Sequence, residues 1–127
     1  MQFIQADSGS FVPASHEDPG RPGVLKRVIA TNRQLQRGRV QMLNWSRLPA
    51  ESSFRPHYHE DMQEIFVLLT GQVMMRCGDD EAMMQPGDTV IVEPREVHEM
   101  TNLLQTDAEY LVFGISSEEG GRTVVVG

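Results

Sequence analysis

The chain has 127 residues, with 11 Lys and Arg against 18 Asp and Glu, and a formal net charge of −7 at pH 7. This length suits one domain with one core. The acidic balance argues against nucleic acid and anionic membranes as partners, because both carry negative charge. The longest apolar run, residues 65–69, is too short to span a bilayer, and residues 1–7 lack the basic flank and apolar core of a secretory signal. A soluble, cytoplasmic protein is therefore expected.

Residues 1–23 are expected to form an irregular N-terminal arm, and residues 24–127 a single β-domain. Proline and glycine are dense in the arm, as in His16-Glu17-Asp18-Pro19-Gly20-Arg21-Pro22-Gly23, and do not sustain a helix or an interior strand. His16 lies in this polar segment and is expected to be a solvated side chain. Cys77 is the single cysteine, which excludes an internal disulfide, and its apolar surroundings predict a small buried hydrophobe.

Short strand-like runs follow one another from residue 24, separated by Gly, Pro and Asp. Runs 64–69 and 72–77, on either side of Thr70-Gly71, have the pattern of a β-hairpin. Many short strands at close spacing, without an amphipathic helix between them, indicate an all-β sandwich or barrel. The expected strands are residues 24–31, 39–45, 64–69, 72–77, 82–85, 89–92, 96–102, 109–115 and, at an edge, 123–126.

Two histidines one residue apart stand at the centre of the chain. His57 and His59 point to the same face of an extended segment, because side chains alternate along a strand. If residues 64–69 form the neighbouring strand, the Glu64 carboxylate points into the same space. With His98, these residues offer three imidazoles and one carboxylate, a donor set that suits a divalent first-row metal. The alternative is a set of partly buried polar residues satisfied by hydrogen bonds.

The spacing of these residues resembles the two conserved motifs of the cupin superfamily. His57-x-His59, four residues, Glu64, six residues and Gly71 resemble the first motif. Gly87, ten residues, His98, three residues and Asn102 resemble the second. The resemblance implies a double-stranded β-helix, or jelly-roll barrel, with one divalent metal ion (Fe, Mn, Ni, Cu or Zn) inside it. It also implies a homodimer, for which residues 24–31 offer a sheet edge. The metal ligands implied are His57, His59, Glu64 and His98.

The second motif departs from the family pattern just before its histidine. The usual proline and glycine correspond here to Glu93 and Arg95, with Pro94 between them. The loss of the glycine predicts an altered turn, because other residues tolerate a positive φ poorly. Asn102 is expected to hydrogen-bond backbone groups at the end of its strand.

Strand alternation predicts which side chains accompany the ligands. Arg55 shares the parity of His57, and is expected either to bind an anionic substrate group or to form an outward salt bridge. Phe66 follows Glu64, and Met100 follows His98, so strand parity turns both toward the pocket, although ordinary barrel core is the favoured role for most such apolar residues. The predicted substrate-binding residues are Arg55, Phe66, Met100 and Tyr110, the last also considered as a general acid.

Cupins include dioxygenases, decarboxylases, sugar isomerases and epimerases, storage proteins and ligand-sensing domains, so the resemblance does not fix an activity. We predict a metal-dependent enzyme of the oxygenase or decarboxylase type, acting on a small oxygenated organic molecule, in which Glu64 is a ligand that also accepts a proton. The alternatives are a non-catalytic cupin that binds a small molecule, and a sugar isomerase or epimerase.

Overall fold

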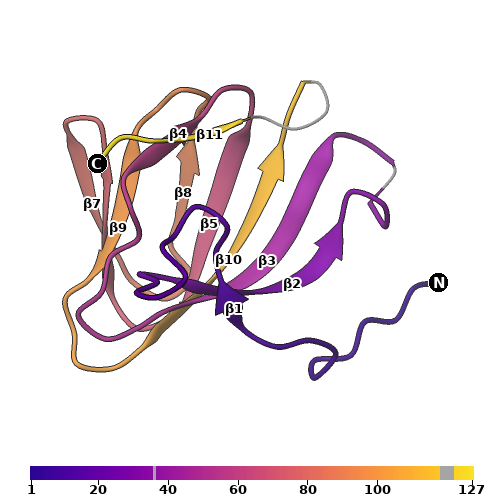
Figure 1. Ribbon diagram of the computed structural model, residues 1–127, viewed down its shortest axis with the longest axis horizontal. Coiled ribbons are helices and arrows are strands. Elements are labelled where there is room, and N and C mark those ends of the chain that lie inside the picture. The colour runs from indigo at the N-terminus through magenta and orange to yellow at the C-terminus, as the bar shows by residue number, and fades with distance from the viewer. Residues whose placement is uncertain (36, 118–121) are drawn as a thin grey trace.

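The computed structural model describes residues 1–35, 37–117 and 122–127, which form eleven strands and no helix. The strands make two antiparallel sheets that face each other as a barrel (Figure 1). Across the six-stranded sheet lie β1 (Val12–Pro13), β2 (Leu25–Thr31), β3 (Val40–Leu48), β10 (Ala108–Ile115), β5 (Gln63–Thr70) and β8 (Thr89–Val92). Across the five-stranded sheet lie β11 (Thr123–Val125), β4 (His57–His59), β9 (His98–Asn102), β6 (Val73–Cys77) and β7 (Asp80–Met84). The all-β barrel predicted from the sequence is confirmed.

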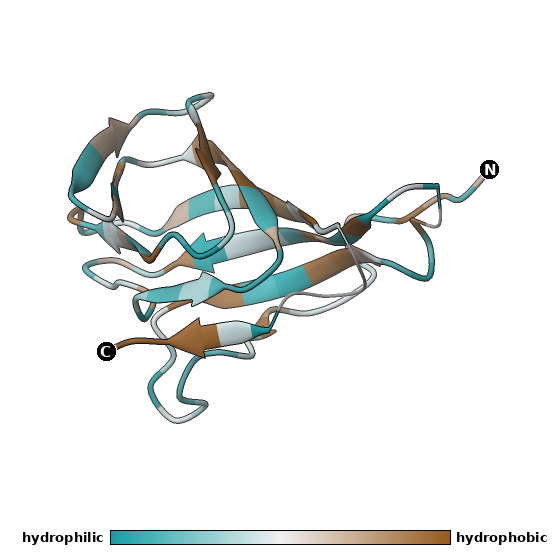
Figure 2. Cartoon of the chain, turned by 90° about the horizontal axis from the view of Figure 1, so that it is seen from above, coloured by the Kyte–Doolittle hydropathy of each residue, from teal (hydrophilic) through white to brown (hydrophobic). Residues whose placement is uncertain are grey.

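Alternation of side chains along the strands divides the barrel into a buried interior and an exposed surface. Along β5, Glu64, Phe66 and Leu68 are buried, while the residues between them are partly exposed. In Figure 2 most connecting loops are hydrophilic, and the most hydrophobic segments lie on strands. No helix long and apolar enough to cross a membrane occurs in the described part of the chain.

Inward-facing residues of one strand lie at different depths in the barrel, from its polar end to its apolar core. Along β9 the buried residues are His98, Met100 and Asn102 in turn. Met100 is fully buried in the hydrophobic core. The expectation that it lines the pocket is wrong, because it lies two residues beyond His98, about 6.6 Å further down the strand. The core also contains Leu48, Leu68, Val73, Met75, Met84 and Val92.

The predicted hairpin of residues 64–77 is wrong. β5 pairs with β10 and β8, whereas β6 pairs with β9 and β7 in the other sheet. Gly71, with φ of 92°, lies where the chain passes from one sheet to the other. A turn of this kind has the same local sequence signal as a hairpin turn, but its strands take partners from elsewhere. The hairpin in this region is β6 with β7, in which Cys77 is opposite Asp80.

The N-terminal arm folds back across one end of the barrel and contains a short strand, β1, which pairs with β2. Glu17 is 7% exposed and accepts hydrogen bonds from the backbone N–H groups of Gly23 and Arg55. Gly23 has no room for a side chain, since a Cβ atom would lie 1.8 Å from the carbonyl oxygen of Ser53. The buried carboxylate and the close backbone contact fix the arm on the barrel.

Asn102 joins the far end of β9 to the loops around it. Its Nδ2 donates to the carbonyl oxygens of Leu48, Pro49 and Thr106 at 2.9–3.2 Å, and its Oδ1 accepts from the N–H of Leu104. The residue is 1% exposed, so water does not replace these partners. The hydrogen bonding predicted for Asn102 is confirmed.

Replacing Asn102 with alanine is expected to lower the free energy of unfolding by about 3 kcal/mol, because several buried backbone groups lose their partner at once. Urea unfolding followed by circular dichroism measures the change. The matched control is Asn32→Ala, since Asn32 is exposed and makes one side-chain contact of 3.5 Å, and it is expected to change stability by less than about 0.5 kcal/mol. Equal stability of the two variants would contradict the role of Asn102.

Candidate metal centre

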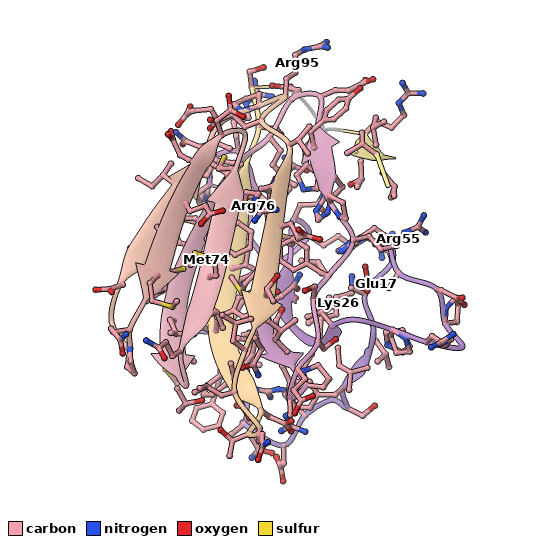
Figure 3. The ribbon with its side chains drawn as sticks, turned by 90° about the vertical axis from the view of Figure 1, so that its left-hand side faces the viewer. Glu17, Lys26, Arg55, Met74, Arg76 and Arg95 are labelled. Atoms are coloured by element: carbon pink, nitrogen blue, oxygen red, sulfur yellow. The ribbon has the colours of Figure 1, made fainter. Side chains whose placement is uncertain are left out.

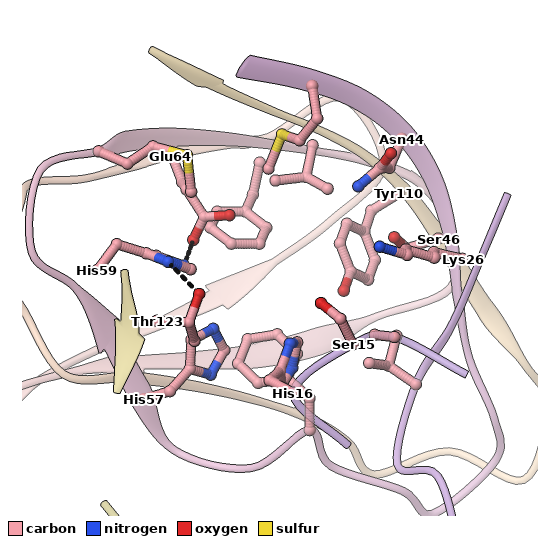
Figure 4. A pocket seen from close by; sticks show the side chains of 17 residues that line it. Ser15, His16, Lys26, Asn44, Ser46, His57, His59, Glu64, Tyr110 and Thr123 are labelled. Carbon is pink, nitrogen blue, oxygen red and sulfur yellow. Dashed lines mark hydrogen bonds and ion pairs between the residues drawn. The ribbon is translucent and has the colours of Figure 1, made fainter. Parts of the chain in front are cut away.

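Four side chains from three strands converge inside one end of the barrel, and Figure 4 shows three of them, His57, His59 and Glu64. His57 and His59 lie on β4, and His98 lies on the adjacent strand β9, directly opposite His57 in the register. Glu64 comes from β5, so its carboxylate reaches across the interior from the other sheet rather than from a neighbouring strand. All four are buried, and one potential ligand atom of each lies within 4.8 Å of the others.

Each imidazole is oriented by a hydrogen bond at its Nδ1 atom. His57 Nδ1–H donates to the carbonyl oxygen of Arg55 at 2.6 Å, and His98 Nδ1–H donates to that of Glu96 at 3.0 Å. His59 Nδ1 lies 2.9 Å from the hydroxyl of Thr123 on β11. A carbonyl only accepts, so the proton of His57 and of His98 is on Nδ1, and each Nε2 presents its lone pair to the centre. Metal-binding histidines are commonly oriented in this way.

The contacts of Glu64 test whether this cluster suits a cation. Its Oε1 lies 2.7 Å from His59 Nε2 and 3.1 Å from His98 Nε2. His59 Nε2 lacks the direction of a hydrogen bond in spite of this distance. If His98 is neutral, with its proton on Nδ1, its Nε2 lone pair faces a carboxylate oxygen, and either a second proton on the imidazole or a metal cation must separate the two acceptors. The donor set therefore fits a divalent metal ion.

The protonation states also favour a metal. Burial, followed by the charges of His98 and His16, lowers the pKa of His57 to about 3. Burial raises the pKa of Glu64, but the His59 and His98 imidazoles that lie against its carboxylate outweigh burial and lower that pKa to about 2. At neutral pH His57 is thus neutral and Glu64 ionised, as metal ligands must be.

A cavity of about 160 Å³ opens beside three of the four donors, His57, His59 and Glu64. It is smaller than the roughly 300–1,000 Å³ typical of sites for drug-sized ligands, which indicates a small metabolite. Its apolar wall is formed by Ala14, Val24, Met42, Phe54, Met62, Phe66 and Val112.

Two of the four predicted substrate-binding residues line the cavity, and two, Met100 and Arg55, do not. Phe66 and Tyr110 are part of the lining. Burial raises the pKa of Tyr110, while a hydrogen bond with Ser46 acts in the opposite direction, so the phenol stays protonated. Arg55 is exposed and donates through Nη2 to the carbonyl oxygen of Gly127 (Figure 3). Arg55 lies outside the cavity lining, because it precedes β4 and strand parity does not extend to it, and it forms no ion pair with a described residue.

The arm brings an unexpected histidine to the site. The His16 side chain is 17% exposed, and its ring centroid lies 4.1 Å from that of His57. The expectation of a solvated side chain is wrong, because the neighbouring Glu17 anchors this turn of the arm in the barrel. No local pattern in the sequence reveals this placement, and the same holds for the other polar lining residues Ser15, Lys26, Asn44, Ser46 and Thr123.

The turn before His98 keeps a left-handed conformation without a glycine. Arg95 has a φ of 69°, and its N–H donates to the carbonyl oxygen of His59 at 2.8 Å. This conformation costs roughly 1–2 kcal/mol for a residue with a Cβ atom. The hydrogen bond to His59 ties the turn to the strand that holds two of the four donors.

Comparison with known proteins places this architecture in a family. The family described as "Cupin domain" matches residues 44–114, which is more than half of the chain and includes all four donors. The chain belongs to the cupin family. The resemblance predicted from the two motifs is confirmed.

Individual relatives of this cupin are distant. It is 24% identical over 92 residues to the oxalate-binding protein of Thermotoga maritima, a match that covers 72% of this chain and 76% of the relative. The structure described as a predicted oxalate decarboxylase from Thermotoga maritima has a TM-score of 0.79 and 22% identity, and the match covers 91% of this chain and 99% of that one. The polyketide cyclase RemF from Streptomyces resistomycificus has a TM-score of 0.76 and 18% identity, with 100% of this chain and 87% of that chain covered. At these identities the structural matches show the fold alone.

Proposed function

We propose that this cupin is a metal-dependent enzyme of the decarboxylase or oxygenase type that acts on a small oxygenated organic acid. The observation that carries the proposal is the convergence of three oriented imidazoles and one ionised carboxylate beside a small cavity. The names of two similar proteins, an oxalate-binding protein and a predicted oxalate decarboxylase, support a carboxylic acid as the ligand.

Each part of the site has a defined task in this proposal. The Nε2 atoms of His57, His59 and His98, together with Glu64, hold the ion, and Glu64 is also placed to accept a proton. A bound divalent ion supplies Lewis-acid or redox chemistry toward substrate oxygens. Phe54 and Phe66 exclude water from the cavity. Tyr110, which stays protonated, supplies a hydroxyl that donates a hydrogen bond to bound substrate.

The test is turnover by protein loaded separately with iron, manganese, nickel, copper or zinc. Oxygen uptake and release of CO2 are measured for a panel of small hydroxy, keto and dicarboxylic acids, beginning with oxalate. We expect metal-dependent turnover of at least one acid, and its loss in the Glu64→Gln variant. The absence of oxygen uptake and of CO2 release with every acid in the panel, at full metal occupancy, would contradict the proposal that the protein is an enzyme.

A non-catalytic cupin that binds the same acids is the second candidate, favoured by the name of the oxalate-binding relative. Acids that raise the melting temperature without turnover identify it, because a ligand that binds only the folded state stabilises it. The sugar isomerase or epimerase reading has less support, because the cavity is small and one wall of it is apolar.

A further inference from the structure

The cavity has a second polar wall, across from the four candidate ligands. In Figure 4, Glu64 and His59 lie on one side, and Tyr110, Asn44, Ser46 and Lys26 gather on the other. These four residues come from three neighbouring strands of the six-stranded sheet, β2, β3 and β10. The register places Ser46 beside both Lys26 and Tyr110, so the group is fixed by strand pairing rather than by a loop.

This second wall contains a polar atom without a partner. Asn44 is 6% exposed, and its Oδ1 atom makes no hydrogen bond with any described residue. The residues opposite it in the register are Val28 and Val112, whose side chains have no donor to offer. An unpaired buried amide oxygen is unfavourable, so Asn44 is a polar point of this wall that the described part of the chain leaves unsatisfied.

The wall also contains a cation without a counter-ion. Lys26 is half-buried in the lining and forms no ion pair within the part of the chain that the structure describes. The two buried carboxylates nearby are already engaged. Glu64 contacts His59 and His98, and Glu17 accepts from two backbone N–H groups. Lys26 is therefore available to an anionic group of a ligand.

The charges of the two walls define a substrate class. A divalent ion with the Glu64 carboxylate leaves a net charge of about +1 at one end of the cavity, and Lys26 adds a second positive charge at the other. A volume of about 160 Å³ holds on the order of ten water molecules. This is more room than oxalate needs, because its two carboxylates are on adjacent atoms and both bind at one end.

We propose that Lys26 forms a second subsite beside Asn44, which binds the distal carboxylate of a small hydroxy-dicarboxylic acid whose hydroxyl and other carboxylate are held at the metal centre. The inference rests on the proposed function in one respect, namely that one end of the acid binds the metal. The chain thus selects acids longer than oxalate, through residues that lie outside the two cupin motifs.

Calorimetric titration of the metal-loaded protein with malate and lactate tests this subsite. Both are 2-hydroxy acids with the same chelating end, but lactate lacks the second carboxylate. We expect malate to bind at least about tenfold more tightly, as a hydrogen bond to a charged group predicts. Lys26→Met is expected to abolish this preference while leaving the affinity for lactate and for oxalate within about twofold, and Lys26→Arg to restore part of it.

Equal affinity of the wild-type protein for malate and lactate, failure of malate to bind, or an undiminished preference in Lys26→Met would overturn the inference. Thermal unfolding of both variants checks that the barrel is intact. Failure of the proposed function has a different signature, namely binding of both acids that does not change when the metal is removed, or the absence of turnover across the panel. The two ideas can therefore fail separately.

Discussion

Protein with alanine in place of His98 is expected to lose its metal, with affinity lowered by more than about 100-fold. Hydrogen-bond partners of metal ligands are themselves worth roughly 10–100-fold in affinity, so removal of a ligand costs more. His98 is 1% exposed and contacts Glu64, and its removal leaves a buried carboxylate with one imidazole partner fewer. Elemental analysis of protein purified without a metal-binding tag is expected to find about one ion per chain in the wild type, as a four-ligand site requires.

His16→Ala is the matched control, because His16 lies beside His57 but outside the group of four donors. It is expected to keep the metal. His59→Ala repeats the test from another strand, and circular dichroism checks that each variant is folded. Full metal content in both His98→Ala and His59→Ala would mean that the four residues are structural polar groups.

Removal of the metal by a chelator is expected to lower the melting temperature by roughly 12–24 °C. An ion present at 1,000 times its dissociation constant stabilises the folded state by about 4 kcal/mol. For a domain of this size each kcal/mol corresponds to roughly 3–6 °C. Calorimetry with and without chelator measures the shift, and the His98→Ala variant is expected to show none.

The metal-free protein is further expected to lose stability as the pH falls from about 6.5 toward 3. The pKa of His57 is about 3 in the folded chain and near 6.5 in the unfolded chain, so the unfolded state binds more protons in this interval. The lowered pKa of Glu64 acts in the same direction below about 4.5. The slope is about 1.4 kcal/mol per pH unit for each proton. Denaturant titrations at several pH values measure it, and a His57→Gln variant with an unchanged slope would contradict the assignment.

The donor set and the fold class follow from the linear pattern of residues. His57 and His59 face the same way because side chains alternate along a strand, and the spacing to Glu64, Gly71, His98 and Asn102 matches the family. Alternation involves adjacent residues and motif spacing is counted along the chain, so both are visible without the fold. Phe66 and Tyr110 also lie at the cavity, as alternation predicts.

The residues around the donors are brought there by contacts between distant parts of the chain. The turn at Gly71 carries the chain between sheets, although its local signal is that of a hairpin, because strand pairing depends on partners far away in the sequence. Met100 has the predicted parity but lies one layer deeper, in the core. His16 enters the site because Glu17 anchors the arm through backbone groups, and Lys26 and Asn44 face the metal centre because three strands from separate parts of the chain pair beside one another. Local periodicity contains no information about these long-range contacts, which arise only when the barrel closes.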